Sequence, residues 1–158
     1  MYIVENECLE EIRKIWLENN SGYIGNNCNL RSIKDNNMLK VVCKTDTDVC
    51  GYAVLYFGKD FCELEKYPNY IENMPKKTIY MWEMITSKNH LKEGVASKIY
   101  DYIKTKFNDY TIYAAIDEKN IPSLNLHIKE KFIPIYNFYK EDENVIYIMH
   151  EWSNAKGE

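Results

Sequence analysis

An apolar strand followed by a helix that starts at a glycine lies at the centre of this sequence. Residues 79–85 read IYMWEMI, residues 86–93 read TSKNHLKE and residues 94–107 read GVASKIYDYIKTKF. These runs predict a strand, a polar loop and a helix. The first turn of a helix offers backbone N–H groups without partners at the positive end of the helix dipole. Because Gly94 has no Cβ to hold a ligand away, the pattern indicates a phosphate or pyrophosphate site, although an ordinary strand–helix connection also fits it.

The composition is that of a soluble globular protein. Of 158 residues, 46% are hydrophobic and 28% charged, so we expect one domain over residues 1–152 with a frayed tail at 153–158. The net charge of −4 argues against a general nucleic-acid binder. Five cysteines without CxxC spacing favour reduced thiols in the cytoplasm over a metal site or a disulfide framework. No apolar run is long enough to span a membrane. From these observations together we expect a cytoplasmic protein without metal, nucleic-acid or membrane partners. We expect it to be a monomer or a homodimer.

The spacing of apolar residues predicts the other elements. It predicts helices over residues 8–19 and from Asn120 or Ile121 to about Phe132, the second with a buried stripe. The expected stripe residues are Leu124, Ile128 and Phe132. Strands are predicted at residues 2–4, 39–44, 49–57, 111–116, 133–139 and 145–152, and the pair 39–44 and 49–57 reads as an antiparallel hairpin. Gly51 inside a strand indicates a bulge or a close backbone approach. This order predicts a mixed α/β protein with a central sheet.

Two short motifs carry the strongest signal. Residues 91–96 read LKEGVA, which is similar to a pyrophosphate loop of pattern [Gln/Arg]-x-x-Gly-x-[Gly/Ala], with Leu91 in place of Gln or Arg. Residues 120–132 read NIPSLNLHIKEKF, which is similar to Asn-x-x-[Ala/Ser]-x-x-Leu-[Tyr/His]-x-x-x-Gly-Phe, with Lys131 in place of glycine. Both patterns are signatures of the GNAT superfamily of acyl-CoA-dependent N-acyltransferases, which the chain resembles over nearly its whole length.

The resemblance implies a fold and a cosubstrate. The fold is α/β, with a mixed, mostly antiparallel central sheet of six to seven strands, helices on both faces and a V-shaped splay between two parallel strands, here near residues 81–86 and 111–116. The arm of acetyl-CoA would lie in the splay, with its pyrophosphate on the helix that begins at Gly94. Asn120 fits the cofactor and a helix cap equally well. The residues implied to contact the cofactor are Ile85, Thr86, Leu91, Lys92, Glu93, Gly94, Val95, Ala96, Ser97, Asn120 and Ser123.

The resemblance also implies an activity. The chain would be an N-acetyltransferase that moves an acetyl group from acetyl-CoA to an amine of a small molecule or protein by direct attack. Leu91 and Lys131 keep a second class open, an acyl-CoA-binding sensor or regulatory protein of the same fold with little turnover. An interaction module without cofactor or chemistry is the third. The segments that would define the acceptor, residues 21–37 and 58–78, carry no specific signature.

The candidates for catalysis are a glutamate, a histidine and two tyrosines of one strand, each with a structural alternative. Glu83 is the one acid in an apolar strand, so it reads as a base or amine-recognition group, or as a salt-bridged structural residue. His127 stands where the signature carries Tyr or His; it would help to protonate the departing thiolate, or would pack against the sheet. Tyr136 and Tyr139 lie in the strand that faces the acceptor in this family, although tyrosines are mostly core and cleft walls.

Overall fold

The computed structural model describes residues 1–19, 35–59 and 75–154. The elements within these ranges follow the predicted order and begin or end within a few residues of the predicted bounds. They are β1 (Tyr2–Glu5), α1 (Leu9–Asn19), β2 (Leu39–Lys44), β3 (Val49–Phe57), β4 (Thr78–Thr86), the 3-10 helix η2 (Lys88–His90), α4 (Val95–Lys106), β5 (Thr111–Asp117), α5 (Ile121–Lys129), β6 (Ile133–Lys140) and β7 (Val145–Trp152). Most of the two segments expected to define the acceptor, and the end of the C-terminal tail, lie outside the described residues.

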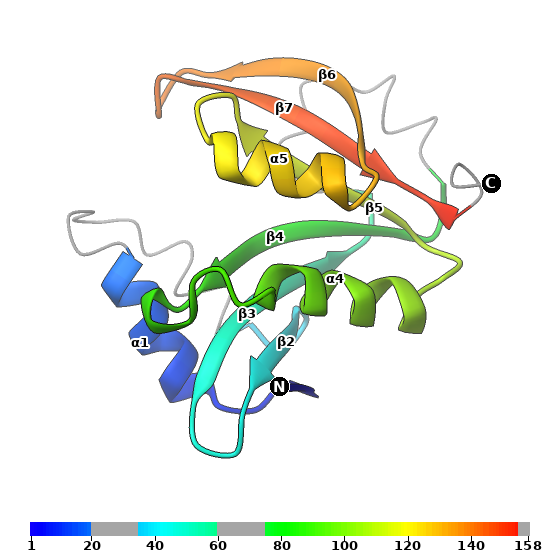
Figure 1. The fold of residues 1–158 in the computed structure, drawn as a ribbon. Coiled ribbons are helices and arrows are strands. Elements are labelled where there is room, and N and C mark those ends of the chain that lie inside the picture. The colour runs from blue at the N-terminus through cyan, green and yellow to red at the C-terminus, as the bar shows by residue number, and fades with distance from the viewer. Residues whose placement is uncertain (20–34, 60–74, 155–158) are drawn as a thin grey trace. The chain divides into compact units, whose positions relative to one another are not determined.

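The described strands form one sheet in the order β1-β2-β3-β4-β5-β7-β6. Strand β1 pairs antiparallel with β2 at one edge, and β2 and β3 form the predicted hairpin. Strands β4 and β5 run parallel, and in this pair Thr78–Tyr80 align with Thr111–Tyr113. A parallel pair requires a crossover, and α4 supplies it (Figure 1). The expected fold class, mixed and mostly antiparallel, is therefore confirmed.

The chain divides into two compact units that share β4. The first unit contains Met1–Tyr56 and Trp82–Thr105, and the second contains Phe57–Met81 and Lys106–Glu158. The first unit thus holds β1, β2, β3, α1, the end of β4 and the start of α4. The second unit holds the start of β4 together with β5, α5, β6 and β7.

Helices cover both faces of the sheet in the first unit. On one face, Ile12, Ile15 and Trp16 of α1 pack in a cluster with Met38 and with the strand residues Val42, Tyr52 and Val54. Gly51 precedes Tyr52 and therefore faces the other side of the sheet, where α4 lies. A Cβ on Gly51 would stand 2.7 Å from Val95 Cγ1 and 2.8 Å from the Ile85 carbonyl oxygen. The close backbone approach expected at this glycine is confirmed.

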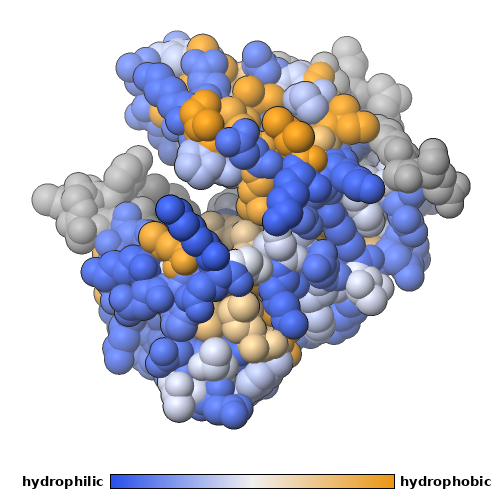
Figure 2. All heavy atoms as spheres, viewed as in Figure 1, coloured by the Kyte–Doolittle hydropathy of each residue, from blue (hydrophilic) through white to orange (hydrophobic). Residues whose placement is uncertain are grey.

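In the second unit, α5 presents a different face from the predicted one. Ile128 is 67% exposed, whereas His127 is 4% exposed and Phe132 is buried. Figure 2 shows apolar side chains over α5. Two exposed isoleucines, Ile121 and Ile128, belong to this helix. The predicted stripe placed Ile128 on the same face as Phe132 by assuming that the helix continues to Phe132. For Ile128 this prediction was wrong.

The chain instead leaves α5 after Lys129. Lys131 adopts φ +66°, its N–H bonds the Ile128 carbonyl, and the Phe132 N–H bonds the His127 carbonyl at 2.9 Å. This is a Schellman turn, in which the residue after the left-handed position folds back onto the helix. The Phe132 ring accordingly meets the His127 ring edge-on, with 5.0 Å between centroids.

Three further findings concern the described residues alone. No helix among them is long and apolar enough to cross a membrane. They contain no group of three His, Cys, Asp or Glu residues arranged to hold a metal ion. Within them, Cys8, Cys43 and Cys50 carry free thiols, and burial raises the pKa of the Cys43 and Cys50 thiols.

Candidate active site

The loop between β4 and α4 has a backbone suited to an anion. Lys92 and Gly94 both adopt left-handed conformations, with φ +64° and +79°. The Gly94 carbonyl accepts the Lys98 N–H at 3.0 Å, so Gly94 caps the start of α4. A Cβ on Gly94 would meet no atom within 4 Å. The space in front of the first helical turn is therefore open, and the loop residues 91–94 are exposed.

The electrostatics of this helix start also suit a phosphate. The first turn of α4 contains no acidic residue, and its leading N–H groups have no acceptors within the helix. Lys92 and Lys98 are exposed beside it. The one acid of the loop, Glu93, is engaged elsewhere, because its Oε2 lies 2.9 Å from His90 Nδ1. The backbone and its neighbouring charges fit a pyrophosphate.

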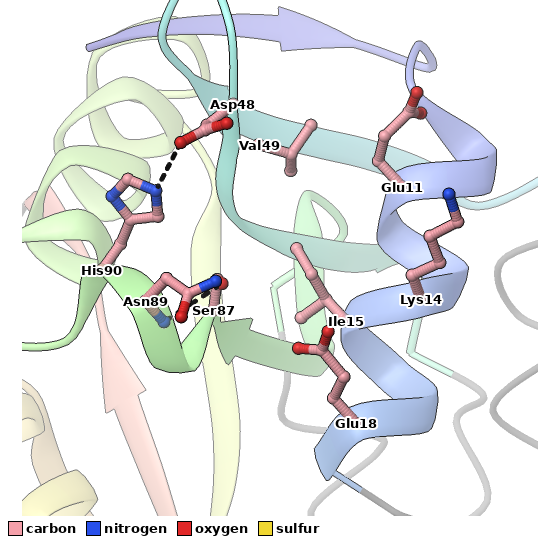
Figure 3. Close-up of a pocket in the computed structure, with 9 residues that line it drawn as sticks. All are labelled: Glu11, Lys14, Ile15, Glu18, Asp48, Val49, Ser87, Asn89 and His90. Atoms are coloured by element: carbon pink, nitrogen blue, oxygen red, sulfur yellow. Dashed lines mark hydrogen bonds and ion pairs between the residues drawn. The ribbon is translucent and has the colours of Figure 1, made fainter.

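His90 connects this loop to the β2–β3 turn. Its Nδ1 lies 2.9 Å from Glu93 Oε2. Its Nε2 lies 3.4 Å from Asp48 Oδ2, a contact that Figure 3 shows. The imidazole thus spans two carboxylates from separate segments of the first unit. It borders a cavity of about 170 Å³ lined by Glu11, Lys14, Ile15, Glu18, Asp48, Val49, Ser87, Asn89 and His90. Among the described residues expected to contact the cofactor, none lines this cavity.

Glu83 has one hydrogen-bonded and one unpaired carboxylate oxygen among the described residues. The Tyr52 hydroxyl donates a hydrogen bond to Glu83 Oε1. Glu83 Oε2 is buried and has no hydrogen-bond partner among the described residues. Burial raises the pKa of Glu83 to about 7, although the Tyr52 hydrogen bond opposes the rise. A carboxyl group with this pKa exchanges a proton near neutral pH.

Tyr52 is held as a neutral donor. Its side chain is fully buried in the α1 cluster, and burial together with the nearby Glu83 carboxylate raises the pKa of its hydroxyl. The hydroxyl therefore keeps its proton at any pH at which Glu83 titrates. No salt bridge to Glu83 is found among the described residues, where burial and the Tyr52 hydrogen bond account for the shifted pKa.

The remaining candidates belong to the second unit. Asn120 caps α5, since its Oδ1 accepts the Ser123 N–H at 3.3 Å. His127 Nδ1 donates to the Ser123 carbonyl at 2.7 Å, and the ring lies 5.7 Å from that of His150. Tyr136 follows an irregularity in the β6–β7 register. Burial, and to a smaller extent the nearby Tyr136, raise the pKa of Tyr113 to about 12. The helix-cap and packing alternatives stated for Asn120 and His127 thus describe contacts that these residues make.

Sequence reasoning identified Glu83 but missed its partner Tyr52. A signal was present, because Tyr52 stands among the small residues Cys50, Gly51 and Ala53 in a strand that is buried on both faces. A buried tyrosine hydroxyl requires a polar partner. Since β3 neighbours β4 in the sheet, the one acid of β4 was the available acceptor.

Comparison with known proteins places this geometry in context. A sequence model described as the Acetyltransferase (GNAT) family matches residues 4–132. No curated protein among those compared is similar in sequence. The structure resembles an N-acetyltransferase from Staphylococcus aureus Mu50, with a TM-score of 0.64 and 16% identity over 98% of this chain and 99% of that chain.

Two solved complexes are also similar in fold. An aminoglycoside 6'-N-acetyltransferase complexed with coenzyme A has a TM-score of 0.71 and 8% identity, covering 98% of this chain and 97% of its own. Arabidopsis thaliana NAA60 in complex with acetyl-CoA has a TM-score of 0.65 and 9% identity, and the match covers 96% of this chain and 98% of that chain. At these identities the structural likeness shows a shared fold, while the family match covers most of the chain.

Proposed function

Because the chain belongs to the GNAT acetyltransferase family, we propose that it is an N-acetyltransferase that transfers an acetyl group from acetyl-CoA to an amine. The acceptor is an amine of a small molecule or of a peptide. One observation carries the proposal beyond family membership. Glu83 is a buried carboxyl group with a pKa of about 7, and its Oε2 has no donor among the described residues.

The helix start at Gly94 would hold the cosubstrate. The N–H groups of Val95, Ala96 and Ser97 are the leading donors of α4, and the open space at Gly94 lets a phosphate reach them. When bound, acetyl-CoA supplies a thioester whose acetyl group passes to the amine nitrogen while CoA leaves as a thiol. The other steps depend on the side chains of the chain itself.

Glu83 would prepare the amine for attack. Alkyl amines are mostly protonated at neutral pH, and the nitrogen must lose a proton before its lone pair can react. Glu83 Oε2 is an acceptor that an amine N–H would satisfy. Since its pKa lies near 7, the carboxylate is populated at neutral pH and is basic enough to take the proton. Tyr52 already donates a hydrogen bond to the other oxygen, Oε1.

The structural relatives suggest which amines to test. One is an aminoglycoside acetyltransferase, and another is a ribosomal-protein-S18-alanine N-acetyltransferase from Escherichia coli. Because these relatives share the fold at 8% identity, the choice between a small molecule and a peptide rests on measurement. A panel of polyamines, aminoglycosides and peptides with free N-termini covers both.

Two assays on the full chain test the proposal. Acetyl-CoA at about 100 times its Kd should stabilise the fold by roughly 2.7 kcal/mol, and thiol release should depend on one class of amine. Gly94→Glu places a carboxylate in the proposed phosphate site and should abolish the stabilisation. Binding without amine-dependent thiol release from any acceptor class would overturn the enzymatic proposal in favour of an acyl-CoA-binding sensor. Absence of binding would favour an interaction module.

A further inference from the structure

Tyr52 and Glu83 form a pair in which the two oxygens of one carboxylate differ in role. Oε1 accepts the Tyr52 hydroxyl hydrogen, whereas Oε2 is buried and has no partner among the described residues. Tyr52 itself is fully buried and cannot rotate its ring out of the α1 cluster without opening the core. The hydroxyl therefore stays on Oε1.

This arrangement decides where a proton can reside on Glu83. When Glu83 is ionised, Tyr52 donates to Oε1 and stabilises the charged form. When Glu83 takes up a proton, Oε1 is already occupied by the donated hydrogen, so the proton binds at Oε2. Among the described residues, Tyr52 is the one titratable group that acts on this carboxyl group, and the other influence is burial.

We propose that Tyr52 is a positioning residue of the acetyltransferase site, which fixes Glu83 Oε2 as the atom that accepts the proton from the acceptor amine. The inference rests on the proposed function and names a residue that the family motifs do not contain. Tyr52 does not touch the reacting atoms; it acts through Glu83. One proton would move from the amine nitrogen to Oε2. The nitrogen lone pair would then form the N–C bond as the thioester C–S bond breaks, and the second proton lost from nitrogen would convert the departing CoA thiolate to a thiol.

The first test measures the titration of Glu83 without using turnover. The carboxyl carbons of glutamate are labelled with ¹³C, and the Glu83 signal is assigned by its loss in Glu83→Gln. Removing the hydroxyl in Tyr52→Phe keeps the ring and should move the Glu83 midpoint upward by about one pH unit, because burial is then unopposed. Unchanged titration in a folded Tyr52→Phe protein would overturn the proposal.

A matched control is available in the same unit. The Tyr102 hydroxyl donates to Glu5 Oε2, so Tyr102→Phe removes a tyrosine–glutamate hydrogen bond from another site. It should leave the Glu83 midpoint where it is. If Tyr52→Phe fails to fold, the unmutated chain made with 3-fluorotyrosine replaces it, since the more acidic phenol is a stronger donor and should lower the Glu83 midpoint. A midpoint that does not fall would likewise overturn the proposal.

The second test separates this inference from the proposed function. With the best acceptor, the acidic limb of the kcat/KM profile should move upward in Tyr52→Phe by the same amount as the Glu83 midpoint, and acetyl-CoA affinity should be unchanged. A merely structural tyrosine would lower Tm and leave the limb in place, which would count against a positioning role. If the midpoint moves but no amine is acetylated, the Tyr52–Glu83 relation holds and the proposed function fails.

Discussion

Gly51 lies so close to Val95 that no larger residue fits between β3 and the start of α4. An added Cβ would stand 2.7 Å from Val95 Cγ1 and 2.8 Å from the Ile85 carbonyl oxygen. The first contact involves a side chain, but the second involves backbone that cannot move aside. This glycine therefore sets the position of the helix whose first turn is the proposed phosphate site.

Gly51→Ala should lower the free energy of unfolding by about 1–3 kcal/mol, the usual cost of overpacking a core. It should also weaken acetyl-CoA binding, because the helix start must shift. Chemical denaturation and a binding titration measure the two effects. Adding Val95→Ala should recover part of the lost stability, since it removes Cγ1 but not the Ile85 carbonyl. A Gly51→Ala protein as stable as the wild type would contradict the close approach.

Glu83→Gln should change stability in a pH-dependent way. The folded-state pKa of about 7 lies above the ordinary 4.5, so the folded protein binds more protons than the unfolded chain between these values. The wild type therefore loses stability as pH rises through this window, whereas the glutamine variant does not titrate. Relative to wild type, Glu83→Gln should gain about 3 kcal/mol between about pH 4 and pH 8. Denaturation at a series of pH values measures it, and a flat difference would rule out the raised pKa.

Lys131→Gly should stabilise the protein. Lys131 holds φ +66° at the Schellman turn, a conformation that costs a residue with a Cβ roughly 1–2 kcal/mol and glycine almost nothing. We expect a gain of about 1 kcal/mol, read from the thermal midpoint. The same change at Lys129, the last residue of α5, should instead cost about 1 kcal/mol of helix propensity. Equal effects at both positions would be inconsistent with the turn.

His127→Phe tests whether this histidine donates a proton to the departing thiolate. The imidazole is buried, bonds the Ser123 carbonyl through Nδ1 and packs against Phe132, and a phenyl ring keeps the packing. We expect turnover to fall by less than about tenfold, whereas loss of a general acid typically costs roughly a hundredfold. A tenfold or larger fall in kcat with unchanged acetyl-CoA affinity would restore His127 as a proton donor.

The sequence was sufficient for the order of the elements and for the strand–loop–helix at Gly94. Apolar spacing and glycine placement are local properties, and they predict local structure well. The buried face of α5 was mispredicted because its end depends on the left-handed conformation of Lys131, which the replacement of glycine by lysine concealed. Lys131 departs from the family motif in residue type while keeping the backbone conformation that glycine favours.

The chemistry of the candidate site required the folded structure. Glu83 stood out as an acid in an apolar strand, but its raised pKa and its two unequal oxygens depend on Tyr52, which lies 31 residues earlier. Such a contact arises from the pairing of strands, which sequence spacing does not determine. The contact of His90 with Asp48 depends on the same kind of long-range placement, whereas its contact with Glu93, three residues later, is local.

The most direct test of the account is the pH dependence of kcat/KM for acetyl transfer by the wild type and by Glu83→Gln, using the amine that gives the fastest thiol release. The account predicts a wild-type rate that rises through an acidic limb near pH 7, where the Glu83 carboxylate forms. Glu83→Gln should lose this limb and about a hundredfold in rate, with acetyl-CoA binding intact. A Glu83→Gln enzyme that retains the wild-type rate and the same limb would contradict it.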